Sequence, residues 1–282
     1  MKARPEFFEF GQIDAKYRHS CRVVECAGCH KSGWSDKKDI ERQRRASLVI
    51  LQAEKEERVQ TGIPGLDGLI AGGLQAGDFV LLVGGIGTGK TIFSSEFAYQ
   101  GALTLGQPAV YATFEEDVVS LRRNMIKLGM DFQSLEAAKK IKLLDLEALE
   151  GRGMGSNLET ILSAIDEVKA KRLVLDSLTA FLSGTSGKFD YSFLMHLIYK
   201  TLKREKITTI MTVSEFNGPN EYTQGLEQFV ADGVFEIENY LADNMELKTR
   251  FMVRKLRGAE HSRKYHTVVF SSKGIEILPY TV

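Results

Sequence analysis

The sequence lacks the features that mark several large classes of protein. It has no net charge, because 37 lysines and arginines balance 37 aspartates and glutamates, so no global excess of positive charge favours nucleic acid as a partner. No apolar run approaches the roughly 18 residues that span a membrane, and the N-terminus has no uninterrupted apolar stretch typical of secretory signals. We therefore expect a cytoplasmic protein without a membrane segment. Its apolar fraction of 43% is sufficient for a sizeable core.

Cysteine is absent after position 29. The three cysteines, Cys21, Cys26 and Cys29, form an odd and clustered set, which is a poor framework for disulfides. Together with His19 or His30 they could bind zinc, because thiolates and imidazoles are its usual ligands. The spacing C-x4-C-x2-C-H matches no common zinc finger, however, and we favour a loosely structured, reduced tail over a metal site.

The chain divides into three parts by composition. Residues 1–45 mix charged, aromatic and glycine residues without periodicity, and we interpret them as an appendage of uncertain order. Residues 46–58 belong to a stretch rich in good helix formers, which predicts a linking helix. From residue 59 to residue 282 apolar runs alternate with helix-like segments, and we assign this part to one domain.

Residues 59–282 have the pattern of an α/β fold. Apolar, β-branched runs predict strands at 79–85, 109–114, 140–146, 172–178 and 208–216. Amphipathic segments lie between most of these runs, and such alternation indicates a mostly parallel central sheet flanked by helices on both faces. Toward the C-terminus short strands follow one another without long helices, so we expect an antiparallel extension at one edge of the sheet.

The run GGIGTGKT follows the first of these strands and precedes a helix. It satisfies the phosphate-binding pattern G-x-x-x-x-G-K-[ST] in the context that the pattern requires. Small residues let backbone N–H groups wrap the phosphates of a nucleotide at the N-terminus of the helix. We expect Lys90 to reach the β- and γ-phosphates and the Thr91 hydroxyl to bind Mg²⁺. The predicted phosphate-binding residues are Gly84, Gly85, Ile86, Gly87, Thr88, Gly89, Lys90 and Thr91.

Acidic residues follow other predicted strands at positions suited to metal binding and hydrolysis. Asp176 ends the strand RLVLD, where a carboxylate can hold Mg²⁺ directly or through water. Glu115 and Glu116 can face the γ-phosphate, because the carboxyl ends of parallel strands line the ligand crevice. We predict that this pair orients or deprotonates the attacking water. Ser214 and Glu215 occupy a similar position and could sense the nucleotide state.

The basic run KLRGAEHSRKYH, residues 255–266, has three interpretations. It could bind nucleic acid, its two histidines could bind a metal, or its cations could neutralise phosphates. His261 and His266 have no supporting carboxylate or cysteine pattern, which argues against a metal. Lys255 and Arg257 stand two apart on a predicted strand and therefore point to the same side. Since a P-loop lysine leaves γ-phosphate charge to neutralise, we favour contacts with phosphates.

Several motifs, in order, resemble a single KaiC-type domain of the RecA/RadA ATPase superfamily. They extend from about residue 58 to the end and read GIPGLDGLIAGGLQAGDFVLLVGGIGTGKT, AVYATFEED, RLVLDSLTAF, GLEQFVADGVFEIE and KLRGAEHSRKYHTVVFSSKGIEILP. The resemblance implies a RecA-like core that assembles into a ring, usually a hexamer, with ATP at each subunit interface. It also implies that Glu115 and Glu116 are catalytic. The residues that it implies to contact the ATP of a neighbouring subunit are Lys255, Arg257 and His261.

Two departures from the family pattern bear on function. Ile86 stands where the family's P-loop commonly has proline, a change that a backbone cradle tolerates. Gln228 and Phe229 stand where the autophosphorylating domain has adjacent Ser and Thr, so we expect ATP hydrolysis without autophosphorylation there. The founding clock protein has two tandem domains, whereas this chain shows one, and a clock role is not implied.

Two other functions compete with a ring-forming ATPase that acts on an unidentified partner protein. A recombinase-like filament would bind DNA through the loops LSGTSGKFD and NGPNEYTQG, but these contain one lysine against two acids, a poor match for DNA phosphates. The basic stretch KKDIERQRR is more simply a solvated helix face. The other alternative is a nucleotide-gated scaffold, in which assembly rather than turnover matters.

Overall fold

The computed structural model describes residues 58–146, 153–182, 188–214, 230–243 and 245–279. The chain divides after Lys55, and all of these residues belong to the unit Glu56–Val282. Arg58, which the sequence assigned to the end of the linking helix, instead begins a short strand, because its backbone pairs with Gln75. The other expected residues of that helix lie outside the described part, as do the appendage, the three cysteines, Glu215, Gln228 and Phe229.

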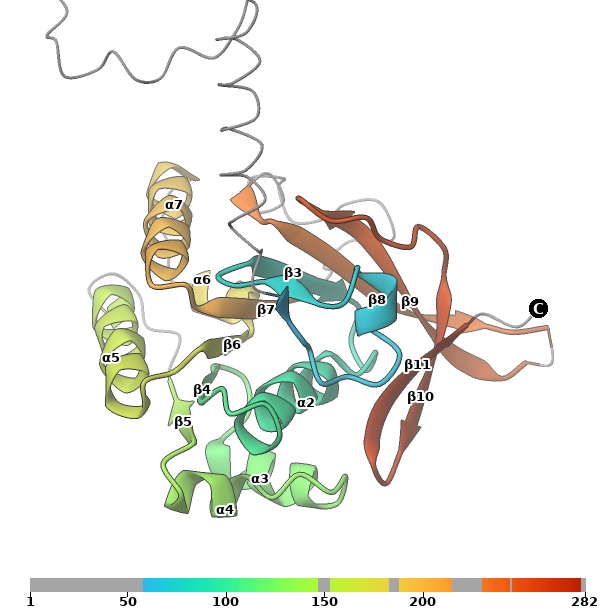
Figure 1. Cartoon of the computed structure of the whole chain (residues 1–282), viewed down its shortest axis with the longest axis horizontal. Helices are drawn as coiled ribbons and strands as arrows, with labels where there is room; N and C mark the ends of the chain where they lie inside the picture. The colour runs from blue at the N-terminus through green and yellow to red at the C-terminus, as the bar shows by residue number, and fades with distance from the viewer. Residues whose placement is uncertain (1–57, 147–152, 183–187, 215–229, 244, 280–282) are drawn as a thin grey trace, which may run out of the picture. The chain divides into compact units, whose positions relative to one another are not determined.

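The described residues form a nine-stranded sheet with the order β11-β10-β9-β8-β3-β7-β6-β4-β5 (Figure 1). The strands from β8 to β5 pair in parallel, and β9, β10 and β11 extend the sheet in antiparallel. Their bounds are β3 (Phe79–Gly84), β4 (Ala109–Thr113), β5 (Ile141–Asp145), β6 (Arg172–Asp176), β7 (Thr208–Ser214), β8 (Gly233–Leu241), β9 (Leu247–Leu256), β10 (His266–Ser271) and β11 (Gly274–Pro279). A separate antiparallel pair joins β1 (Arg58–Val59) to β2 (Leu74–Gln75). The predicted α/β architecture, with its C-terminal antiparallel extension, is confirmed.

Helices cover both faces of the sheet because its central strands bury side chains on both. Along β3, Val80 and Leu82 belong to one core cluster, whereas Phe79, Leu81 and Val83 belong to the other. The helices of the first cluster are α2 (Lys90–Leu103), α3 (Val118–Ile126) and α4 (Phe132–Ala137). Those of the second are α5 (Gly153–Val168), α6 (Leu178–Leu182) and α7 (Lys188–Arg204). Burial on both faces explains why the strand sequences are continuous apolar runs rather than alternating ones.

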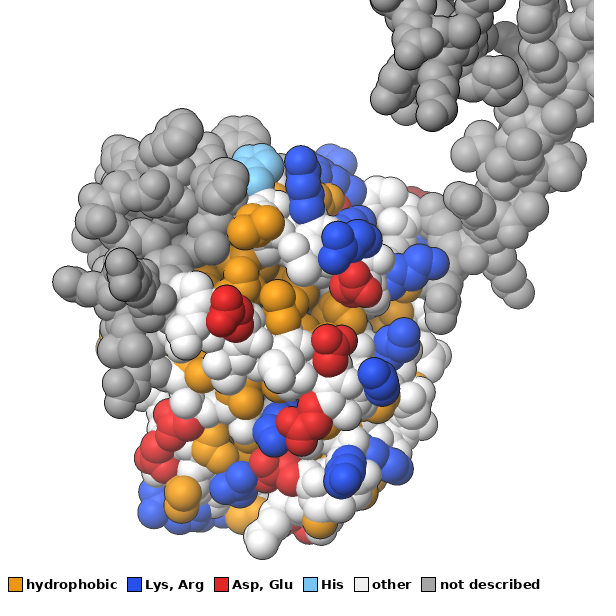
Figure 2. All heavy atoms as spheres, turned by 90° about the vertical axis from the view of Figure 1, so that its left-hand side faces the viewer, with side chains coloured by type: hydrophobic (Ala, Val, Ile, Leu, Met, Phe, Trp, Pro, Cys, Tyr) orange, Lys and Arg blue, Asp and Glu red, His pale blue; other side chains and the backbone are white. Residues whose placement is uncertain are grey.

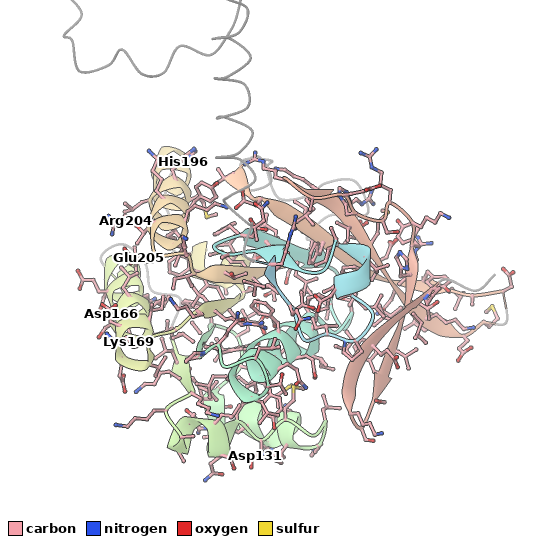
Figure 3. All side chains as sticks on the ribbon, viewed as in Figure 1. Asp131, Asp166, Lys169, His196, Arg204 and Glu205 are labelled. Atoms are coloured by element: carbon pink, nitrogen blue, oxygen red, sulfur yellow. The ribbon has the colours of Figure 1, made fainter. Side chains whose placement is uncertain are left out.

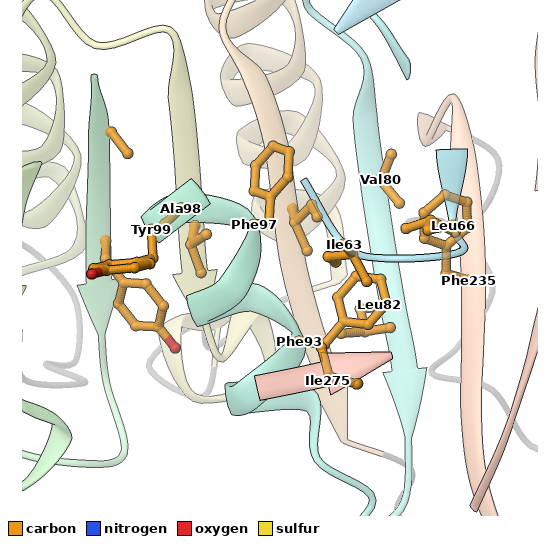
Figure 4. Packing of buried hydrophobic residues seen from close by; sticks show 14 of the residues in the cluster. Ile63, Leu66, Val80, Leu82, Phe93, Phe97, Ala98, Tyr99, Phe235 and Ile275 are labelled. Carbon is orange, nitrogen blue, oxygen red and sulfur yellow. The ribbon is translucent and has the colours of Figure 1, made fainter. Parts of the chain in front are cut away.

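Aromatic packing fixes α2 against the sheet. The ring of Phe93 stacks on Phe251 of β9 with centroids 5.7 Å apart and meets Phe235 of β8 edge-on at 6.4 Å. Figure 4 shows Phe93 between Leu82 of β3 and Ile275 of β11. Aromatic pairs of this kind contribute about 0.5–1.5 kcal/mol each beyond their buried area. These contacts hold α2, which begins at the lysine of GGIGTGKT, against the sheet.

Charged residues mark the ends of the outer helices (Figure 3). Asp131 caps α4 by accepting a hydrogen bond from the backbone N–H of Ser134 at 3.1 Å. Arg204 ends α7 and forms an ion pair with Glu205 at 2.9 Å. Lys169 follows α5 with a φ of +55°, the left-handed conformation in which helices commonly end.

The parallel register brings four strand ends to one edge of the sheet. Gly84 at the end of β3 is the register partner of Ser214 at the end of β7. Thr113 at the end of β4 is likewise the partner of Asp176 at the end of β6. Ligands of open α/β sheets bind outside the carboxyl ends of such strands. The residues that end or follow these four strands therefore define the candidate site.

Candidate nucleotide-binding site

The run GGIGTGKT forms a loop between β3 and α2 that depends on its glycines. Gly87 and Gly89 have φ values of +73° and +91°, which residues with a Cβ rarely adopt. Gly84 packs so closely on β8 that a Cβ there would stand 2.2 Å from the carbonyl oxygen of Ile237. Gly89 is the N-cap of α2 and offers no side chain to cap it. The first N–H groups of the helix therefore remain available for an anion.

Lys90 is folded over this loop. Its Nζ donates hydrogen bonds to the carbonyl oxygens of Gly84 and Gly85, each at 2.8 Å. Thr88 closes the loop from the other side, since its Oγ1 donates to Gly85 O at 2.9 Å. The ammonium group thus already lies on the backbone that would cradle a phosphate. The side chain of Ile86 is 94% exposed and makes no contribution to the cradle, which is consistent with tolerance of different residues there.

Asp176 lies buried at the end of β6, with only 6% of the residue exposed. Its Oδ2 accepts a hydrogen bond from the Tyr111 hydroxyl at 2.8 Å, and its Oδ1 accepts one from Thr212 Oγ1 at 2.5 Å. Burial raises the pKa of Tyr111 well above its ordinary value, and the charge of Asp176 adds to the effect. The tyrosine therefore keeps its proton and remains a donor to the carboxylate.

Glu115 and Glu116 follow β4 but point to different partners. Glu115 Oε1 accepts a hydrogen bond from Oγ of Ser177, the residue after Asp176. Glu116 Oε1 instead accepts one from Asn124 Nδ2 of α3 at 2.6 Å. Glu115 is thus the member of the pair directed toward the carboxyl end of β6. Ser177 also accepts from the N–H of Ala180 at 3.1 Å and so caps α6.

The three basic residues predicted to act on a neighbouring nucleotide lie away from the P-loop of their own chain. Lys255 pairs with Val234 near the start of β8, and its Nζ donates to Ala231 O at 2.7 Å. Arg257 follows β9, and its Nη1 stands 3.8 Å from Asp232 Oδ1. His261 lies beyond it, where its Nδ1 is 3.3 Å from Ala259 O.

Backbone hydrogen bonds show how far Arg257 lies from the P-loop of its own chain. The N–H of Arg257 donates to Asp232 O, and the N–H of Asp232 donates to Phe79 O, so Arg257 lies level with the start of β3. The P-loop begins at Gly84, at the other end of that strand. Five residues of strand span about 16 Å. The structure therefore brings together the P-loop, Asp176, Glu115 and Glu116, but not Lys255, Arg257 and His261.

Burial and the nearby charge of Arg257 lower the pKa of Lys255. Lys255 is the last residue but one of β9 and Arg257 directly follows the strand, so each charge lies close enough to affect the other. The Asp232 carboxylate acts in the opposite sense on the pKa of Lys255, so the local charge is mixed rather than purely positive.

Sequence reasoning missed two aromatic residues at the site. Tyr111 stands inside the apolar strand AVYAT, where nothing separates it from an ordinary core residue. Phe270 of β10 packs on the P-loop, since a Cβ built on Gly89 would stand 2.4 Å from its ring. Tyr111 is brought to the site by the pairing of β4 with β6, and Phe270 lies on a strand of the antiparallel extension, so no local pattern near the P-loop reveals either residue.

The oxygen atoms present fit Mg²⁺. That ion prefers oxygen ligands and usually takes one or two carboxylates together with phosphates and water. The Asp176 carboxylate and the Thr91 hydroxyl supply such atoms at one edge of the sheet. In the part of the chain that the structure describes, no group of three or more His, Cys, Asp or Glu residues could hold a metal ion by itself. A metal at this edge would therefore depend on the nucleotide for its remaining ligands.

Comparison with known proteins agrees with this geometry. The family described as "ATPase: KaiC" matches residues 59–282. The chain belongs to the KaiC ATPase family. A UPF0273 protein of Methanocaldococcus jannaschii is 32% identical to it over 244 residues, which are 79% of this chain and 97% of that protein.

Relatives with clock names are longer. The circadian clock protein KaiC3 of Synechocystis is 34% identical over 244 residues, which are 82% of this chain but 48% of that protein. This KaiC-family chain thus spans about half the length of the clock relatives that it matches. A KaiC-like protein of Pyrococcus horikoshii has a solved structure with a TM-score of 0.72 and 34% identity, covering 79% of this chain and 100% of that one. The resemblance and the fold predicted from sequence are both confirmed.

No helix within the described ranges is long and apolar enough to cross a membrane.

Proposed function

We propose that this KaiC-family domain binds ATP with Mg²⁺ at the carboxyl edge of its sheet and hydrolyses it within a ring, most simply a hexamer, in which each ATP lies between two subunits. The observation that supports binding best is the P-loop itself, with Lys90 Nζ resting on the carbonyls of Gly84 and Gly85 at 2.8 Å. Phosphate oxygens can replace those carbonyls as acceptors with a small movement of the side chain.

The acids at this edge have separate proposed roles. Thr91 and Asp176 would hold Mg²⁺, which when bound neutralises charge between the β- and γ-phosphates. Glu115, hydrogen-bonded to Ser177 beside Asp176, would accept the proton of the attacking water or orient it. Glu116, tied to Asn124 of α3, would support the same step from farther away.

The placement of the remaining cations supports a shared site. Lys255 and Arg257 lie level with the first residues of β3 and β8, whereas their own P-loop lies at the carboxyl ends of the parallel strands. They can therefore act on a nucleotide only in another subunit. Contact between opposite edges of identical chains is a head-to-tail interface, which generates a closed ring or an open filament. A ring is what membership of the KaiC family favours. Arg257 and Lys255 would then neutralise γ-phosphate charge, with His261 beside them.

Nucleotide binding is tested by Lys90→Ala. The variant is expected to lose ATP binding, measured by calorimetry, and ATP turnover. Lys127→Ala, a change of an exposed lysine at the end of α3, is the matched control and should retain both. Turnover at the wild-type rate in Lys90→Ala would refute the proposal.

The shared site is tested by mixing two inactive variants. Arg257→Ala should lower turnover by about 1,000-fold, the lower end of the effect of a trans-acting arginine. The double variant Glu115→Gln/Glu116→Gln should also be inactive. Mixed assemblies contain some interfaces with neither defect, so mixing should restore part of the activity. No rescue in assemblies shown by mass to be mixed would contradict a site shared between subunits.

DNA binding is not favoured by the surface seen in Figure 2. On this face, which includes α5 and α7, basic and acidic side chains are interspersed among the residues shown in colour. Affinity for DNA depends on neutralising many phosphates, which requires a continuous basic surface. We also propose that the protein does not phosphorylate itself at Gln228–Phe229. Radiolabel from γ-labelled ATP on that segment would overturn this part of the proposal.

A further inference from the structure

A chain of buried polar groups lies beneath the P-loop. The Ser94 Oγ of α2 is 2.9 Å from Lys90 O and 3.2 Å from Thr91 O, in the first turn of the helix. The same Oγ is 3.3 Å from the Tyr111 hydroxyl, which is 2.8 Å from Asp176 Oδ2. Two carbonyls, two hydroxyls and one carboxylate thus connect the start of the P-loop helix to the end of β6.

Within this series of polar groups, the Tyr111 hydroxyl donates its proton to Asp176. An ionised carboxylate only accepts hydrogen bonds, so the tyrosine donates to Asp176. At its contact with Tyr111, Ser94 can then only be the donor, and its single proton is given either to the tyrosine oxygen or to a carbonyl of the first helical turn. The direction of donation therefore runs from the P-loop helix to the carboxylate.

Two hydroxyls hold the carboxylate of Asp176 by its two oxygens. Tyr111 donates to Oδ2 and Thr212 donates to Oδ1, which fixes the plane of the group. Tyr111 is fully buried and its ring packs on Phe132 with centroids 6.3 Å apart. Its hydroxyl cannot follow a carboxylate that rotates. A rigid donor of this kind holds its acceptor in one orientation.

We propose that Tyr111 is a positioning residue, whose hydroxyl holds the carboxylate of Asp176 in the orientation that binds Mg²⁺. The inference rests on the proposed function, because it assigns a role toward the metal of that nucleotide site. Hydrogen-bond partners of metal ligands typically contribute 10- to 100-fold to metal affinity or activity. A core tyrosine whose hydroxyl merely finds an acceptor would contribute to folding but not to the metal requirement.

Tyr111→Phe separates these roles, because it removes one oxygen and leaves the ring. Tyr99→Phe is the matched control: Tyr99 packs on the same Phe132 at 5.7 Å, and its hydroxyl is not a partner of Asp176. Binding of ADP to the full chain is measured by calorimetry at a series of free Mg²⁺ concentrations and again in EDTA. Tyr111→Phe should raise, about tenfold, the Mg²⁺ concentration at which ADP binding is strengthened by half of its maximum. It should leave ADP binding in EDTA unchanged. Tyr99→Phe should change neither.

The outcomes distinguish this inference from the proposed function. A wild-type protein without Mg²⁺-dependent ADP binding would overturn the proposed function and the role of Tyr111 with it. If the wild type shows the dependence and Tyr111→Phe has the same Mg²⁺ requirement, only the role of Tyr111 is overturned. Equal weakening in Tyr111→Phe and Tyr99→Phe, in EDTA as well, would also overturn it, because the effect would be one of packing.

Thr212→Val provides an independent variant if Tyr111→Phe fails to fold. It removes the hydroxyl at the other oxygen of Asp176 with little change in shape. Like Tyr111→Phe, it should raise the Mg²⁺ concentration that ADP binding requires. An unchanged requirement would contradict the view that the two hydroxyls orient the carboxylate.

Discussion

Replacing Arg172 should destabilise the domain more than any change of an exposed cation. The residue begins β6 and is fully buried. Its guanidinium donates to Gln107 Oε1 at 2.8 Å, Thr61 O at 2.9 Å, Phe97 O at 2.6 Å and also Gln60 O. It thereby joins three segments that are distant in sequence: the chain that enters the domain, the P-loop helix and the turn before β4.

The magnitude follows from two opposing effects. Hydrogen bonds from a charged donor contribute about 1.5–3 kcal/mol each, so four contribute roughly 6–12 kcal/mol. Burying the cation costs several kcal/mol, and the same burial lowers the pKa of Arg172 to about 10. Arg172→Met keeps much of the volume but leaves buried carbonyls without a donor. We expect a loss of about 3–5 kcal/mol, as for other buried charge networks that lose one member.

Urea unfolding followed by circular dichroism measures this loss. With a slope of about 2–3 kcal/mol per molar urea, the midpoint should fall by about 1.5 M. Arg172→Lys keeps the charge but cannot reach four acceptors, so it should also be destabilised. Lys171→Met, at the exposed preceding residue, is the control and should shift the midpoint little. A loss below about 1 kcal/mol in Arg172→Met would refute the reasoning.

Three further predictions concern the site and the stability of the domain. Gly89→Ala places a Cβ on a residue with a φ of +91° and against the Phe270 ring, so ATP binding measured by calorimetry should weaken at least about tenfold. Gly106→Ala is the control, because its φ is +63° and its Cβ would lie in open space, and it should not weaken ATP binding. Glu115→Gln should lower turnover about 100-fold or more and by a larger factor than Glu116→Gln, and the reverse order would contradict their assigned roles. Burial raises the pKa of Glu96 above its ordinary value. The protonated carboxyl therefore stabilises the folded state fully below about pH 4.5, and this stabilisation is lost as pH rises through the folded-state pKa. Glu96→Gln should flatten that decline in melting temperature, and an unchanged profile would exclude this carboxyl as its source.

The parts of the site that the sequence predicts are those in which chemistry and local structure coincide. GGIGTGKT combines its glycines, its lysine and the start of a helix in consecutive residues, so one pattern specifies both conformation and ligand. Asp176 could be placed because the apolar run before it predicts a strand, and the structure puts it at the end of β6. Parallel register then brings it level with Thr113, two residues before Glu115.

The parts that the sequence does not predict depend on pairing between distant segments. Tyr111 resembles a core residue in its own strand, and only the pairing of β4 with β6 places its hydroxyl on Asp176. Arg172 would be expected at the surface, as arginines usually are. It is buried because α2 presents the carbonyl oxygen of Phe97 and a glycine, Gly101, where a Cβ would stand 2.4 Å from its side chain. No residue near Arg172 in sequence supplies these partners.

Strand β3 joins the end of the sheet that carries Arg257 to the end that carries the P-loop. Under the proposed head-to-tail assembly, this connection predicts cooperative turnover. Asp232, which lies 3.8 Å from Arg257, accepts a hydrogen bond from Phe79 N at 3.1 Å and so joins the cation-bearing edge to the first residue of β3. The last residue of β3, Gly84, begins the P-loop, and the strand is buried along its whole length. Close-packed interiors transmit displacement rather than absorb it. A shift of the P-loop on binding ATP should therefore move Arg257 against the next nucleotide. Turnover of the assembled protein should depend sigmoidally on ATP concentration, Asp232→Asn should weaken that dependence, and a hyperbolic response in intact assemblies would contradict the coupling.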